Sequence, residues 1–94
     1  MRVEPPPGGF RGPAKRSLTI AGHLTSVSLE PVFWQALEAA ARTRALPLSA
    51  LVAAIDAARI EEAEAPNLAS AIRSWLLVEA RRTGEPGPGR PAAP

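Results

Sequence analysis

Between residues 25 and 37 the spacing of apolar side chains changes from every second position to a helical period. Val27 and Leu29 alternate with hydroxyl-bearing residues, a pattern that predicts a half-buried strand. Pro31 follows, and proline suits the first position of a helix because its missing N–H would have no partner there. Glu30 then takes the cap position, where its carboxylate lies at the positive end of the helix dipole. We therefore expect a strand that runs directly into an amphipathic helix.

A second alternating segment, residues 16–20, precedes this strand. Its apolar residues, Leu18 and Ile20, occupy even positions, whereas those of the later strand occupy odd ones. A single continuous strand would therefore need a bulge or turn near Gly22 to bring both pairs to the same side. The pattern leaves open whether residues 16–29 form one kinked strand or two short strands.

Two helices are predicted next, separated by a break at Pro47. The first should span residues 31–44. The second should begin at Leu48 and continue to Arg59 or slightly beyond, with apolar residues at helical spacing. Its apolar stripe is wide enough to face both the first helix and a partner.

A third helix is predicted over residues 68–82. Asn67 is a good N-cap for it, and its last turn carries two arginines that suit the negative end of the helix dipole. An acidic connector, residues 61–66, joins it to the second helix. We expect Arg73 to pair with one of the connector's three carboxylates.

Proline and glycine are concentrated at both ends of the chain. Residues 1–14 are predicted to be a disordered basic arm and residues 83–94 a disordered tail, which leaves one domain, residues 15–82. A core of that size is marginal in a monomer, so help from a second copy is expected. Residues 1–16 carry four basic side chains and one acidic one, a net charge of +3, whereas residues 17–82 have a net charge of −1. The arm could bind phosphate or merely aid solubility, and both alternatives remain open.

Composition excludes several classes of function. The chain has no cysteine, which rules out disulfides and thiolate metal sites, and its single imidazole, His23, is too few for a zinc site. No nucleophile motif surrounds His23, so we expect a turn residue, no enzyme activity and no metal or cofactor. The sequence shows neither a signal-peptide core nor an apolar run near the roughly 20 residues of a membrane span. A cytoplasmic protein of bacterial type, with no membrane partner, is expected.

The chain resembles the ribbon-helix-helix family of small dimeric DNA-binding proteins in the run Ser26-Val27-Ser28-Leu29-Glu30-Pro31, followed by Leu37, Ala41, Leu46, Ser49, Leu51 and Ile55. A more specific resemblance, to a proteobacterial subgroup of that family, rests on Gly22-His23, Thr25-Ser26 and Phe33-Trp34. The resemblance covers nearly all of residues 15–82. It implies a mainly α fold with one short β-strand: a ribbon-helix-helix (β-α-α) unit plus a third C-terminal helix, in an intertwined homodimer.

The resemblance also implies a function: a sequence-specific, DNA-binding transcription regulator such as a repressor. Its partners would be double-stranded DNA and a second copy, whose strands together enter the major groove as an antiparallel ribbon. Base contacts are then expected from Leu24, Ser26 and Ser28. Phosphate contacts are expected from Lys15, Arg16, His23, Leu48 and Ser49. The dimer core would contain Val27, Leu29, Phe33, Leu37, Leu51, Val52 and Ile55.

Leu24 leaves a second function open. DNA-reading relatives commonly carry a basic or amide side chain at this outward position, and Leu24 cannot make a bidentate contact with a base. The alternative is a protein-protein interaction module of the same fold with little DNA affinity, including an antitoxin-like protein. The tail after Arg82 argues against an antitoxin, because it has no large apolar residue to anchor in a groove.

Overall fold

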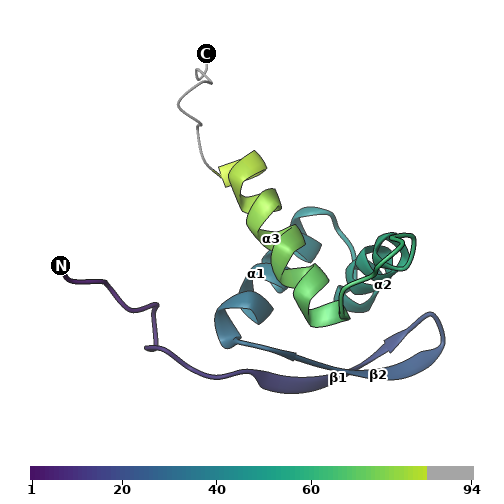
Figure 1. Ribbon diagram of the computed structural model, residues 1–94, viewed down its shortest axis with the longest axis horizontal. Coiled ribbons are helices and arrows are strands. Elements are labelled where there is room, and N and C mark those ends of the chain that lie inside the picture. Colours follow the sequence, from purple (N-terminus) through teal and green to yellow (C-terminus); the bar gives the residue numbers. More distant parts are fainter. Residues whose placement is uncertain (85–94) are drawn as a thin grey trace, which may run out of the picture.

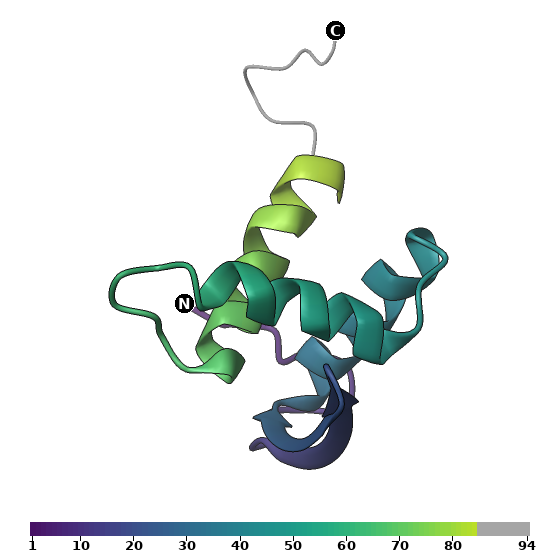
Figure 2. The same cartoon turned by 90° about the vertical axis from the view of Figure 1, so that its right-hand side faces the viewer.

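The computed structural model describes residues 1–84. Five elements follow one another along the chain (Figure 1): β1 (Ala14–Ile20), β2 (His23–Leu29), α1 (Pro31–Thr43), α2 (Leu48–Arg59) and α3 (Leu68–Gly84). The two strands form an antiparallel hairpin, and the three helices lie together on one side of it (Figure 2). A β-α-α unit with a third helix is therefore confirmed. The hairpin settles the question of one strand or two, since two strands are present.

A tight turn at Ala21 and Gly22 joins the strands. Both residues have a left-handed backbone, with φ angles of 51° and 84°, as a two-residue type I′ hairpin turn requires. The turn pairs Ile20 with His23, so the numbers of paired residues always add up to 43. An even position on β1 therefore faces an odd position on β2. This register places the apolar residues of both strands on the same face of the hairpin.

The helices begin where the sequence indicates. Pro31 is the first residue of α1 and Glu30 its N-cap. Asn67 caps α3, with its Oδ1 accepting a hydrogen bond from the backbone N–H of Ser70 at 2.8 Å. The C-terminal end of α3 lies two residues beyond the predicted one, at Gly84, and the rest of the predicted tail lies outside the described residues. Among the helices described, none is long and apolar enough to cross a lipid bilayer.

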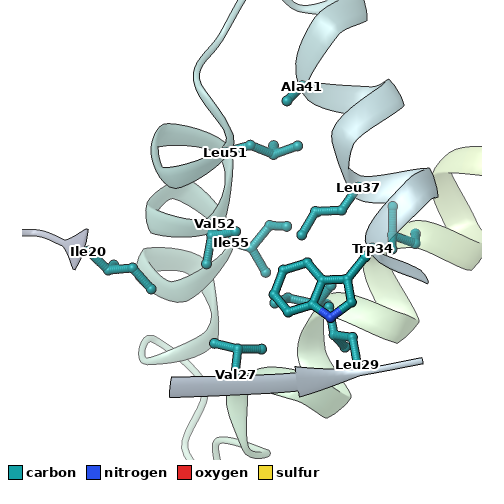
Figure 3. Packing of buried hydrophobic residues seen from close by; sticks show 11 residues of the cluster. Ile20, Val27, Leu29, Trp34, Leu37, Ala41, Leu51, Val52 and Ile55 are labelled. Atoms are coloured by element: carbon teal, nitrogen blue, oxygen red, sulfur yellow. The ribbon is translucent and has the colours of Figure 1, made fainter. Parts of the chain in front are cut away.

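The core lies between the inner face of the hairpin and the three helices (Figure 3). It contains Ile20, Val27, Leu29, Trp34, Leu37, Ala41, Leu51, Val52, Ile55, Ile72 and Leu76. Six of the seven residues expected in a dimer core are thus buried within one chain, and the seventh, Phe33, is half-buried. The chain covers them itself because β1 supplies the second strand of the sheet. The homodimer remains a prediction.

Candidate nucleic-acid interface

The outward face of the hairpin is the surface turned away from the helices. It is formed by alternate residues of both strands, and all six are exposed: Lys15, Ser17, Thr19, Leu24, Ser26 and Ser28. Cross-strand pairing sets Lys15 opposite Ser28 and Ser17 opposite Ser26. Four hydroxyls, one ammonium group and one aliphatic side chain therefore share a face without a carboxylate. Each hydroxyl can both donate and accept a hydrogen bond, so this face can match donors and acceptors on a ligand.

The three expected base-contact residues all lie on this outward face, where Leu24 is 76% exposed. Sequence reasoning missed Ser17 and Thr19, which double the number of hydroxyls there. The available signal was the alternation of residues 16–20, which becomes informative only once the turn fixes the register. His23 is exposed, but it pairs with Ile20 beside the turn and does not belong to the outward face.

Arg16 lies on the inner face of the hairpin, opposite Val27. Its Nη1 donates to Oε2 of Glu38 on α1 at 2.8 Å, and its guanidinium carbon lies 4.5 Å from the centroid of the Trp34 ring. The Arg16 and Glu38 side chains are 44% and 38% exposed, so the ion pair alone contributes little stability. Together with the cation–π contact, it connects β1 to α1. Lys15, the neighbouring cation, is the one that faces outward.

Trp34 holds the beginning of β1 against α1. Its side chain is buried, and its indole N–H donates to the carbonyl oxygen of Ala14 at 2.8 Å. A buried indole N–H needs such an acceptor, and here the acceptor belongs to a strand 20 residues away in sequence. In Figure 3 the ring lies above Leu29, between α1 and the sheet. The hairpin is therefore fixed to the helices by its inner face, which leaves its outward face free.

The start of α2 provides a second group of polar atoms. Pro47 is the N-cap of α2, and its carbonyl accepts hydrogen bonds from the N–H groups of Ala50 and Leu51 at 3.0 and 3.2 Å. The N–H groups of Leu48 and Ser49 come before the first bond within the helix, so they point out of its N-terminal end. Both residues are half-buried. An anion could accept hydrogen bonds from these groups.

Glu30 and Arg73 link the junction between β2 and α1 to α3. Nε of Arg73 donates to Oε1 of Glu30 at 3.1 Å, so the expectation that Arg73 pairs with the acidic connector is wrong. The guanidinium also lies over the Phe33 ring, 5.8 Å from its centroid. A hydrogen bond from its own backbone N–H, followed by the one from Arg73, holds the pKa of Glu30 below its ordinary value. The additional helix α3 therefore supports the segment that follows the hairpin.

A family model described as a ribbon-helix-helix domain matches residues 13–80, which include the hairpin, α1, α2 and most of α3. No curated protein and no solved structure matches the chain. The matched range begins at the residue before β1, so the hairpin belongs to the domain.

Proposed function

Because the chain belongs to the ribbon-helix-helix domain family, we propose that it is a sequence-specific DNA-binding regulator of transcription that acts as a homodimer. Domains of this family generally bind DNA, in transcription regulators or in antitoxins. In our proposal, the outward face of the hairpin enters the major groove, which is wide enough for a two-stranded ribbon. Each copy would bring one hairpin to one half-site.

One observation carries this proposal: the outward face combines four hydroxyls with a cation and has no acidic side chain. Ser26 and Ser28 would read base edges, since a hydroxyl can donate to one base atom and accept from another. Leu24 would contact the methyl group of a thymine, the apolar group that the major groove offers. These three residues lie side by side on one strand, so they could contact adjacent base pairs.

Phosphate contacts are assigned to groups around the hairpin. Lys15 is the cation of the outward face, and the N–H groups of Leu48 and Ser49 at the start of α2 could hold a phosphate oxygen. His23 beside the turn would be a further contact. Arg16 is given a positioning role, because its guanidinium is engaged with Glu38 and Trp34. Arg16 would hold the hairpin against α1 at the angle at which its outward face meets the major groove of the DNA.

One observation favours a protein-protein interaction module instead. Leu24 exposes 76% of its surface, and Lys15 is the single cation on the outward face. A partner protein could cover such a face without attraction to phosphate. The two functions differ in their dependence on salt, since DNA binding weakens steeply as salt displaces the protein from phosphates.

Hydroxyl deletions would test base reading. Ser26→Ala and Ser28→Ala should each reduce the preference for the selected operator over random DNA by about 1 kcal/mol, roughly fivefold, while leaving non-specific binding intact. Thr25→Ala is the matched control, because it removes a hydroxyl from the same strand on the opposite face. The operator would first be selected from genomic fragments with the wild-type protein, and affinities measured by fluorescence anisotropy. Equal losses for all three variants would refute base reading by the outward face.

Deleting residues 1–12, which carry Arg2 and Arg11, would test phosphate binding by the arm. Affinity for every duplex should fall, and the slope of log affinity against log salt should flatten, because fewer counterions are released on binding. If the folded wild-type protein retained no duplex at low salt, the DNA-binding proposal would be wrong. The interaction module would then replace it.

A further inference from the structure

A groove lies between α2 and α3, and three of the side chains that line it are only methyl groups. Ala54 and Ala58 line it from α2, about one helical turn apart, and Ala71 lines it from α3. The Trp75 ring and the 40% exposed side chain of Leu46 add further apolar wall. The groove has a volume of about 620 Å³. This volume and these mostly apolar walls are typical of sites that bind small organic molecules.

Two arginines line the groove, and each is already paired with a carboxylate. The Arg44 guanidinium bonds to Glu79, and Arg59 bonds to Asp56 at 2.8 Å. Glu79 also accepts a 3.4 Å contact from Arg82, but that side chain is 66% exposed and lies outside the groove lining. Neither arginine of the lining is therefore free to draw an anion into the groove.

Two carboxylates at one end of the groove have no such partner. Glu62 and Glu64 line the groove from the connector between α2 and α3, which loops out beyond the end of α2 (Figure 2). Both residues are exposed, and in the part of the chain that the structure describes no arginine or lysine pairs with either. The uncompensated charge of the lining is therefore negative and confined to this end. An occupant that matches the groove needs an apolar body and a cation at the connector end.

We propose that this groove binds a small amphipathic organic cation, with a ring system that packs on Trp75 and the alanines and an ammonium group held by Glu62 and Glu64. The Arg44 guanidinium fixes the orientation of the ligand. It lies over the Trp75 ring, 5.0 Å from the centroid, so it repels a second cation from that end of the groove. This site goes beyond the proposed DNA binding, because the groove lining shares no residue with the outward face of the hairpin.

Titration of the protein with naphthylmethylammonium, followed by NMR of the two indole N–H groups, would test the site. The Trp75 resonance should shift and saturate, whereas the resonance of the buried Trp34, which lies outside the groove lining, should stay in place. Naphthoate is the matched control, because it has the same ring system with a carboxylate in place of the ammonium group. It should bind about fivefold more weakly or worse. Equal affinities for the two probes, or no saturable shift of Trp75, would overturn the proposal.

Substitutions would separate the charged end of the groove from its apolar walls. Glu62→Gln combined with Glu64→Gln should weaken binding of the cation about fivefold without weakening that of naphthoate. Ala58→Leu should fill the groove and abolish binding, while Ala57→Leu, at an exposed position of α2 outside the lining, should leave it intact.

Circular dichroism would confirm that all variants fold. Unchanged affinity in the double variant, or equal effects of the two leucine variants, would overturn the proposal. So would a Trp75 resonance that shifts with protein concentration before any probe is added, since another copy of the chain would then fill the groove. DNA retention is measured separately, so its failure would bear on the proposed function alone.

Discussion

The turn of the hairpin contains an alanine where the backbone favours another residue, and replacing it should stabilise the protein. Ala21 has a φ angle of 51°, in the left-handed region that costs an ordinary residue about 1–2 kcal/mol. Asparagine tolerates this region, and Asn-Gly is the preferred dipeptide of a type I′ turn. Ala21 is exposed, so a larger side chain meets no steric obstacle there. We expect Ala21→Asn to stabilise the folded state by about 1 kcal/mol.

The expected gain can be measured by thermal and urea unfolding at equal protein concentration. For a domain of this size, 1 kcal/mol corresponds to a rise in Tm of about 4–8 °C. Ala57→Asn is the matched control: the same substitution on an exposed face of α2, where alanine is the better helix former, should cost about half a kcal/mol. The two variants should therefore shift stability in opposite directions. A loss of stability in Ala21→Asn would refute the argument from the turn, and with it the register that places the outward face.

Three further predictions concern the elements that hold the hairpin in place. Val27→Asp should unfold the chain, because it buries an unpaired charge where the native side chain is 3% exposed; a native circular dichroism spectrum would contradict this. Trp34→Phe should cost about 1–3 kcal/mol in urea unfolding, since the Ala14 carbonyl loses its indole donor; an unchanged midpoint would show that the hydrogen bond is dispensable. The lowered pKa of Glu30 means that its carboxylate contributes stability above the ordinary pKa and that this contribution is lost as pH falls through the lowered value. Glu30→Gln should weaken that acid dependence, as should Arg73→Gln, and acid titrations that superimpose on the wild type would refute the assignment.

Local patterns in the sequence predicted most of the fold. Alternation identified Val27 and Leu29 as the buried residues of β2, and the Pro31 and Asn67 signals located the starts of α1 and α3. Each of these signals depends on neighbours within a few residues. Element boundaries consequently agreed to within about two residues.

Tertiary contacts account for what the sequence did not predict. The sequence did not distinguish one kinked strand from two paired strands, because Ala21 occupies a turn position at which glycine or asparagine gives the usual signal. The inward placement of Arg16 depends on contacts with α1, about 20 residues later in the chain. Arg73 bonds to a carboxylate 43 residues away instead of to the acids nearest in sequence. No local sequence pattern indicates contacts between residues so far apart in the chain. Which cations face outward and which face inward could therefore be seen only in the structure.

Because both strands of the sheet belong to one chain, the ribbon forms by closing a two-residue turn. Hairpins of this kind form within microseconds, at a rate that does not depend on protein concentration. A ribbon assembled from two chains would instead form only after the two chains had met. At low protein concentration that bimolecular step would limit the rate of folding. Here a newly synthesised chain can complete its exposed hydroxyl face before it meets another copy. Under the proposed function, each chain would then reach DNA with its ribbon already formed.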